Sequence, residues 1–523
     1  MAGLRRGAAL ACLFVLAGLP AAGAQALEGR ALREAVRGWR ARNEVALVRG
    51  LAELLALPNV ASDGPNIARN ASHILQMLER RGARGRLLDG AGGPPVVYAE
   101  LPAPGARHTI VVYAHYDGQP VDPARWTSPP WTPVLRTAPP DAGGREVPLA
   151  GLQAGGLGAE WRLYGRSASD DKAPIVAVLA AVDALQELGV ARSVNLKFFL
   201  EGEEEAGSPH LAAVLARHAP LLEADGWLLC DGPVHQTRRM QVYFGARGVT
   251  GLELTAYGPL RPLHSGHYGN WAPNPAVLLA HVVAGLRDVD GRITVAGFYD
   301  DVRALGEAER AALAAVPPVD GMLREAFALH QTEAGGAALV ERIMLPAANV
   351  RGLQAGAVGE KASNAIPSEA TVSIDFRLVP DQTPEKVRAR VEAHLRGQGY
   401  TLVDHEPTAR ERRERPRLLR LHWEAGYPPA RTALDLPFSR AVVAAVEEGL
   451  PQPAVTLPSL GGSIPMYLFA QATSRPIVGL PIVNHDNNQH AADENLRLQN
   501  LWDGVDAFAG VIARLGPLME QGR

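Results

Sequence analysis

The feature that most constrains the fold is a series of short apolar, β-rich runs in the first half of the chain. These runs cover residues 95–99, 109–114, 194–200 and 227–230. Residues 173–188 repeat apolar side chains at helical spacing up to Gly189, and helical patterns also cover 30–56 and 65–82. Because strands that alternate with helices form parallel sheets, we expect an α/β fold with a mixed, largely parallel sheet flanked by helices.

The pattern changes near residue 245. Alternating runs at 249–256 and 370–378 are each followed by a helical pattern, at 275–286 and 384–395. The α/β character returns near Pro437, with a helix at 438–449 and a strand-like run at 477–482. We therefore predict a larger domain in two parts, 25–244 and 433–523, and a smaller α+β domain inserted at 245–432. The Gly- and Pro-rich stretch 136–160 is predicted to be a surface insertion.

The N-terminus has the pattern of an export signal over residues 1–24. Arg5 and Arg6 precede an apolar run at 8–19, and Ala22-Gly23-Ala24 is a small-residue cleavage site. The alternative is an anchor that stays attached, but a run of about 12 residues is short for a bilayer span. We expect a mature protein that is periplasmic or extracellular and has no stable membrane span.

Charge and cysteine content exclude several classes of protein. The chain has 52 basic and 55 acidic residues, a net charge of −3. Such a balance argues against nucleic acids and anionic membranes as partners. The chain has two cysteines, and only Cys230 lies beyond the predicted signal, so we expect no intrachain disulfide.

Polar residues stand directly after the apolar runs, where open α/β sheets bind ligands. Each has a structural alternative: Asp170 could be a helix cap, the Glu residues a solvated loop, His115-x-Asp117 a motif without function, and Asp231 and His490 structural residues. The segments are His115-Tyr116-Asp117, Asp170-Asp171, Glu201 to Glu205, Asp231 and His490. Together, two histidines and several carboxylates suit borderline divalent ions such as Zn²⁺. With one bridging carboxylate, two ions about 3.5–4 Å apart would lower the pKa of a water and polarise a carbonyl.

The ordered set of these motifs resembles the M20 family of di-zinc metallopeptidases, the group of carnosinase, carboxypeptidase G and succinyl-diaminopimelate desuccinylase. The resemblance runs from about residue 40 to the C-terminus. It implies two divalent ions, Zn²⁺ with Mn²⁺ and Co²⁺ as alternatives, and a di-zinc exopeptidase-like fold. It implies that Asp170 bridges the ions, that one adds His115 and Asp231, and that the other adds Glu205 and His490.

The resemblance also implies roles next to the ions. Asp117 would support His115. Glu204 would be the general base if Glu204-Glu205-Ala206-Gly207-Ser208 is the family's E-E-x-G-S. This alignment leaves Glu203 outside the site.

The inserted domain resembles the family's lid and dimerisation domain, which implies a homodimer. The resemblance implies that His264 stabilises an oxyanion, often across the dimer, and that Asn364 and Arg377 grip a substrate carboxylate. Gly461-Gly462-Ser463 resembles a loop that holds this carboxylate through its backbone N–H groups. The alternatives are a surface histidine, a strand-end salt bridge for Arg377 and a plain loop.

The function expected from the sequence is an exported di-zinc metallohydrolase. It would cleave a peptide bond of a dipeptide or a C-terminal residue, with Glu204 moving the proton. The enzyme alternative is an N-acyl amino-acid deacylase or desuccinylase on the same scaffold. Two further readings are a metal- or peptide-binding protein without activity and a phosphohydrolase, which lacks support because the chain has no phosphate-cradling glycine loop.

Overall fold

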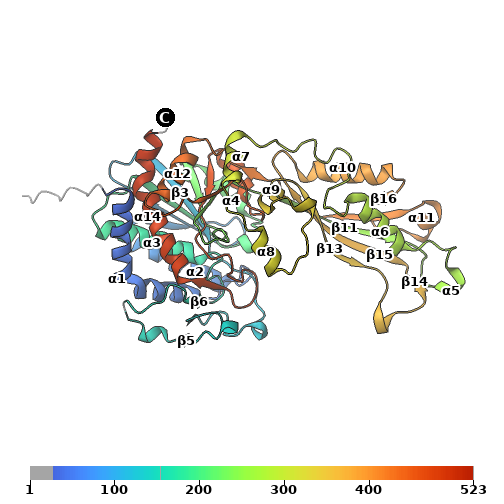
Figure 1. Ribbon diagram of the computed structural model, residues 1–523, viewed down its shortest axis with the longest axis horizontal. Coiled ribbons are helices and arrows are strands. Elements are labelled where there is room, and N and C mark those ends of the chain that lie inside the picture. The colour runs from blue at the N-terminus through green and yellow to red at the C-terminus, as the bar shows by residue number, and fades with distance from the viewer. Residues whose placement is uncertain (1–26, 154, 522–523) are drawn as a thin grey trace, which may run out of the picture.

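The computed structural model describes residues 27–153 and 155–521. The molecule is elongated, with a larger lobe at the left of Figure 1 and a smaller one at the right. The predicted export signal at 1–24 lies outside the described residues. Within the described part, no helix combines the length and the apolar character needed to cross a bilayer.

The larger lobe is built on a mixed sheet that, in the described residues, has eight strands in the order β1-β2-β7-β3-β8-β20-β9-β19. The four strands β7, β3, β8 and β20 are parallel neighbours at its centre. Strands β1, β2 and β9 bring in antiparallel pairings, so the predicted mixed, largely parallel sheet is confirmed. The strands are β1 (Arg84–Leu88), β2 (Val96–Leu101), β3 (His108–His115), β7 (Val194–Glu201), β8 (Gly226–Leu229), β9 (Gln241–Tyr243), β19 (Val455–Leu457) and β20 (Ile477–Gly479).

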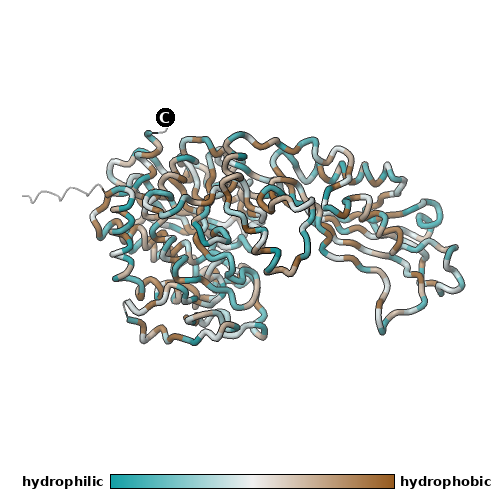
Figure 2. The backbone as a smooth tube through the Cα atoms, in the orientation of Figure 1, coloured by the Kyte–Doolittle hydropathy of each residue, from teal (hydrophilic) through white to brown (hydrophobic). Residues whose placement is uncertain are grey.

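Helices cover both faces of this sheet. Alternate residues of β3 enter two different cores: Ile110 and Val112 pack with α1, α3 and α14, whereas Val111 and Tyr113 pack with α4 and α13. Helix α3 is buried nearly all round because α1 and α14 cover its outer side. Figure 2 shows brown, apolar segments inside the lobe and teal ones at its outer loops. The helices are α1 (Gly29–Leu55), α2 (Gly64–Glu79), α3 (Lys172–Glu187), α4 (Leu211–His218), α12 (Pro437–Glu447), α13 (Met466–Thr473) and α14 (Leu498–Gln521).

The predicted insertion at 136–160 belongs to a small antiparallel sheet of the larger lobe, in the order β21-β6-β4-β5. Many of its described residues are exposed, as expected for a surface segment. The strands are β4 (Val134–Arg136), β5 (Glu146–Val147), β6 (Arg162–Tyr164) and β21 (Asn495–Arg497).

The smaller lobe has a five-stranded sheet in the order β13-β15-β11-β17-β16 and a separate hydrophobic core. Three helices accompany this sheet: α6 (Pro275–Leu286), α10 (Pro384–Gly397) and α11 (Ala409–Glu414). Its strands are β11 (Gly248–Tyr257), β13 (Ala347–Gln354), β15 (Glu369–Leu378), β16 (Thr401–Val403) and β17 (Leu418–Trp423). Strands β12 (Leu263–His264) and β14 (Ala365–Ile366) pair beside α5 (Ser265–Tyr268) at the far tip, and β10 (Gly245–Ala246) pairs with β18 (Ala430–Arg431) between the lobes.

A segment of the inserted region returns toward the larger lobe, and we call residues 307–343 the strap. It contains α7 (Glu307–Ala314), α8 (Asp320–Ala326) and α9 (Leu339–Ile343), which lie between the lobes in Figure 1. Helix α7 contacts β19, and Glu309 forms an ion pair of 2.6 Å with the buried Arg431 of β18. The strap therefore forms one wall of the space beside the carboxyl ends of the central strands.

Candidate metal centre and active site

The candidate site lies where the parallel strands β3, β7, β8 and β20 end. Because these strands are neighbours with one direction, the loops that leave them meet at one edge of the sheet. His115 ends β3, and Asp231 follows β8. Asp170 comes from the turn before α3, and Glu205 from a short 3₁₀ turn after β7. His490 lies on the loop after β20.

The structure brings the five predicted metal ligands together around Asp170. His115 Nε2 lies 2.9 Å from Asp170 Oδ1, and His490 Nε2 lies 3.0 Å from Asp170 Oδ2. His490 Nε2 also lies 3.2 Å from Glu205 Oε2. Donor atoms of His115, Asp170 and Asp231 all lie within 4.8 Å of one another, as do those of Asp170, Glu205 and His490. Asp170 thus belongs to both groups.

Asp117 connects two parts of this site. Its Oδ1 accepts a hydrogen bond from the backbone N–H of Glu204 at 3.1 Å, and its Oδ2 accepts one from Glu205 at 3.0 Å. Its Oδ1 also lies 3.4 Å from His115 Nδ1, on the opposite side of the ring from Asp170. This geometry suits a residue that orients both the His115 imidazole and the turn of Glu203 to Glu205, which we call the acidic turn.

The three glutamates of the acidic turn point into different surroundings. Glu203 points to His210, whose Nδ1 lies 2.9 Å from Glu203 Oε2. Glu204 and Glu205 instead line a cavity above the ligand cluster. This arrangement agrees with the alignment that leaves Glu203 outside the site.

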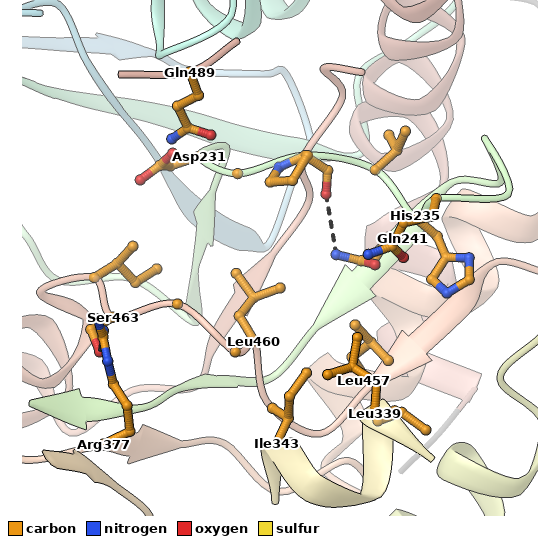
Figure 3. A pocket seen from close by; sticks show the side chains of 18 of the residues that line it. Asp231, His235, Gln241, Leu339, Ile343, Arg377, Leu457, Leu460, Ser463 and Gln489 are labelled. Atoms are coloured by element: carbon orange, nitrogen blue, oxygen red, sulfur yellow. Dashed lines mark hydrogen bonds between the residues drawn. The ribbon is translucent and has the colours of Figure 1, made fainter. Parts of the chain in front are cut away.

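The cavity has a volume of about 880 Å³. It is bounded by the ligand cluster, the loop Gly461-Gly462-Ser463 and the strap. Arg377 reaches it from β15: its Nε donates to Asp375 at 2.7 Å and its Nη1 donates to Ser463 Oγ at 2.9 Å. Figure 3 shows Arg377 and Ser463 together at one end of the cavity. Gly461 and Gly462 also line it. None of the described residues of 136–160 lines this cavity.

His264 and Asn364 lie elsewhere. His264 ends β12 and Asn364 precedes β14, at the far tip of the smaller lobe in Figure 1. Both are exposed, and among the described residues of one chain neither lines the cavity. One chain therefore does not bring these two predicted residues to the ligand cluster.

Comparison with known proteins identifies the family. The model of peptidase family M20/M25/M40 matches residues 111–514. The chain belongs to the M20 peptidase family. It is therefore an enzyme of the metallopeptidase class, and M20 peptidases use a dinuclear metal site.

Relatives of this M20 peptidase match along most of their length. The Cys-Gly metallodipeptidase dug1 of Schizosaccharomyces pombe is 24% identical over 487 residues, which cover 90% of this chain and 95% of that protein. The human Beta-Ala-His dipeptidase is 26% identical over 444 residues, which cover 81% of this chain and 78% of that protein.

Solved structures show the same fold. The M20 family metallo-carboxypeptidase Sso-CP2 from Sulfolobus solfataricus has a TM-score of 0.72 at 26% identity, over 90% of this chain and 99% of that one. Human carnosine dipeptidase 1 has a TM-score of 0.71 at 23% identity, over 94% and 100%.

The residues of this M20 peptidase fit two divalent cations. Glu205 Oε1 is buried, and no hydrogen-bond partner for it is found among the described residues. Burial, together with the charge of Asp170, raises the pKa of Asp231 to about 7. Buried carboxylates that repel one another beside unpaired oxygen atoms are the surroundings that a cation stabilises. Imidazole and carboxylate donors suit Zn²⁺, Mn²⁺ or Co²⁺.

Sequence reasoning missed several polar residues of the site. Gln489 Nε2 donates to Asp170 Oδ2 at 2.7 Å, and Gln119 Nε2 donates to Glu205 Oε2 at 2.8 Å. Buried Glu494 accepts hydrogen bonds from the backbone N–H groups of Ser167, Ser169 and Asp170, and also from Arg166. These residues are close in sequence to His490 or Asp117, and this was the signal that could have found them. Closeness in sequence, however, does not show which way an amide or carboxylate points.

Proposed function

We propose that this M20 peptidase is an exported di-zinc dipeptidase. The observation that carries the proposal is the pair of ligand groups that share Asp170 on the floor of a cavity, with Arg377 and Ser463 at one end of it. Two of its relatives are a Cys-Gly metallodipeptidase and a Beta-Ala-His dipeptidase, which supports a dipeptide substrate.

In this proposal the ligand residues hold the ions and Glu204 moves the proton. His115 and Asp231 would hold one ion, Glu205 and His490 the other, and Asp170 both. When bound, two such ions lower the pKa of a water and polarise the scissile carbonyl. Burial raises the pKa of Glu204 well above its usual value, and the charges of Asp231 and Asp170 raise it further, against the effect of His115. Glu204 would take the proton of the water and pass it to the leaving amine.

The end of the cavity at Arg377 would hold the substrate's terminal carboxylate. Asp375 fixes the guanidinium through Nε, and Ser463 accepts from Nη1. A guanidinium held in one orientation can pair with both oxygens of a carboxylate. The backbone N–H groups of Gly461 and Gly462 would add hydrogen bonds to the same group.

The exposed position of His264 and Asn364 supports a homodimer in which each chain completes the other's site. Two features of the smaller lobe support such pairing. Strand β13 is an edge of the five-stranded sheet and exposes Val350 and Leu353. Helix α6 exposes Val277, which is 54% exposed, together with Ala280 and Ala284 on the same face. An open sheet edge, and exposed apolar side chains on a helix of the same lobe, are typical of a surface that another chain covers.

The pattern at residues 1–24 supports export, and hence a periplasmic or extracellular location, as a proposal from sequence. Export is tested by expressing the full chain with a C-terminal tag and sequencing the N-terminus of the recovered protein. A mature N-terminus close to Gln25 is expected. A product that keeps residues 1–24 contradicts cleavage.

The activity is tested with a panel of amides and purified protein. The panel contains dipeptides, N-acetyl amino acids and N-succinyl amino acids, each assayed with Zn²⁺, Mn²⁺ or Co²⁺ and after treatment with a chelator. We expect hydrolysis of dipeptides that is lost on chelation and restored by metal. Faster cleavage of the N-acyl substrates would instead assign the deacylase function, and full activity after chelation contradicts a metal mechanism.

A further inference from the structure

The end of the cavity remote from Arg377 contains two buried polar residues that the proposed mechanism does not use. Figure 3 shows His235 and Gln241 side by side there, opposite Ser463 and Arg377. His235 and Gln241 are each only 4% exposed, and both line the cavity. Buried polar groups that face a cavity need a partner there, either water or a ligand.

His235 presents a hydrogen-bond donor to the cavity. Its Nδ1 accepts from the backbone N–H of Thr237 at 3.3 Å and lies 2.8 Å from Thr237 Oγ1. The proton of the neutral ring is therefore on Nε2, for which no partner is found among the described residues. Burial lowers the pKa of His235, and the charges of Arg239 and His485 lower it further, which keeps the ring neutral.

Gln241 presents an acceptor. Its Nε2 donates to the backbone oxygen of Pro233 at 3.2 Å, the bond drawn in Figure 3, and this bond sets the orientation of the amide. Its Oε1 is thereby left without a donor among the described residues. A donor and an acceptor side by side complement a group that does both, and a hydroxyl is the simplest such group.

Both residues are held by the same lobe as the metal ligands. His235 lies four residues after Asp231, and the intervening Val234 donates its backbone N–H to Val483 at 2.8 Å. Gln241 begins β9 and pairs with Val455 of β19. The position of the polar pair relative to Asp170 therefore does not depend on movement between the lobes.

Between its Arg377 end and the polar pair, the cavity has an apolar wall. Leu457 and Leu460 form it on the larger lobe, and Leu339 and Ile343 form it on the strap. An apolar channel that ends in a donor–acceptor pair suits an aromatic ring with a hydroxyl at its far end. The whole cavity, at about 880 Å³, is near the upper end of the usual range for small-molecule sites, so it has room for such a group.

We propose that this distal subsite, formed by His235 and Gln241 behind the apolar wall, selects substrates with a large N-terminal side chain that ends in a neutral hydroxyl, for which tyrosine is the probe. The proposal rests on the proposed function, because the carboxylate end at Arg377 makes the opposite end the place of the N-terminal residue. A substrate without the hydroxyl would leave Nε2 of His235 and Oε1 of Gln241 buried and unpaired.

The test compares Tyr-Gly with Phe-Gly, which differ by one hydroxyl, and with Gly-Gly. We expect metal-loaded protein to hydrolyse Tyr-Gly with a kcat/KM about tenfold or more above that of Phe-Gly. His235→Leu should remove this preference and leave the rate on Gly-Gly close to that of the wild type. His235→Gln, which keeps an N–H donor, should restore part of it. His422→Leu, at an exposed histidine of the smaller lobe, is the matched control and should change nothing.

A binding measurement separates this proposal from the proposed function. The probes are analogues of Tyr-Gly and Phe-Gly in which a CH₂–NH group replaces the scissile amide, and calorimetry measures their binding. About tenfold tighter binding of the tyrosine analogue, lost in His235→Leu, supports the subsite even if the protein cleaves no dipeptide. Equal binding of the two analogues overturns it, even if the protein is an active dipeptidase.

Discussion

At the scale of single residues, the adjacent glutamates Glu203 and Glu204 lie in different surroundings, one outside the cavity and one inside it. Glu203 forms a contact with His210 outside the cavity, whereas Glu204 faces Asp170, Asp231 and His115, which perturb its pKa. The 3₁₀ turn after β7, held by Asp117, produces this difference. Three adjacent glutamates in a sequence carry no such information, and the alignment with a family motif was needed to choose among them.

Replacement of Glu204 tests its role as the general base. Glu204→Ala should lower kcat by about 10²–10⁴-fold, because a positioned base contributes that much to proton transfer. Metal content, measured by mass spectrometry of the purified protein, should stay at two ions per chain. Glu203→Gln serves as the matched control, since Glu203 lies outside the cavity, and should keep near wild-type activity. Full activity of Glu204→Ala would refute the role.

Asp170 is the residue that both groups of ligands share. Asp170→Ala should reduce bound metal well below two ions per chain, because each proposed ion loses a ligand. Equilibrium dialysis against Zn²⁺ measures the effect. Asp183→Asn, on helix α3 but paired with Arg81 away from the site, is the control for loss of a carboxylate. Two tightly bound ions in Asp170→Ala would contradict the bridge.

At the scale of elements, strong periodicity predicted the central helices and strands well. The helix expected at 173–188 is α3 at Lys172–Glu187, and the run at 194–200 is β7 at Val194–Glu201. The run at 477–482 gives a shorter strand, β20 at Ile477–Gly479, because Pro481 has no N–H to continue the ladder. The short strands β9 and β19 were not predicted, since three residues carry too little pattern and their pairing is decided by neighbouring strands.

Helix α14 carries an acidic residue whose ionisation opposes folding. Burial and the charge of Asp506 raise the pKa of Asp503 to about 6, even though a hydrogen bond from Gln499 and the charges of Arg37 and Arg33 lower it. Because the pKa of this carboxyl group is higher in the folded state, its protonation favours folding at pH values below about 3.9, the pKa of a free aspartate. This contribution to stability is lost as the pH rises through 6.

Asp503→Asn tests this sign. The variant should unfold a few degrees higher than the wild type at pH 8, where Asp503 is ionised, and at nearly the same temperature at pH 4. Gln499 can donate to the amide oxygen as it does to the carboxylate, so packing is preserved. Calorimetry at both pH values measures the difference, and an equal or lower Tm of the variant at pH 8 would show that the ionised carboxylate is stabilising.

At the scale of the whole molecule, the two lobes separate residues that one reaction would need together. The ligand cluster lies in the larger lobe, whereas His264 and Asn364 lie at the far tip of the smaller one. In the proposed homodimer, which pairs through β13 and α6, His264 of the second copy completes this cluster. The domain boundaries at 245 and 432 stay predictions.

Heterodimers test whether sites are shared. Two differently tagged chains, one Glu204→Ala and the other His264→Ala, are co-expressed and recovered by both tags. If each site combines one chain's cluster with the other's His264, one of the two sites is intact and activity is about half that of the wild type, whereas each variant homodimer is nearly inactive. A heterodimer as inactive as the homodimers would show that each site is built within one chain, and a monomer in solution would contradict pairing altogether.

The sequence alone determined the fold class and the set of metal-ligand candidates. Apolar periodicity is local, and polar residues at strand ends meet wherever parallel strands are neighbours. The tertiary structure decided what depends on side-chain direction and on distant segments. Examples are the amides of Gln119 and Gln489 beside the cluster, the strap as a cavity wall, His235 and Gln241 at its far end, and the separation of His264 from the cluster. These features depend on contacts between residues tens to hundreds of positions apart, which a single sequence does not record.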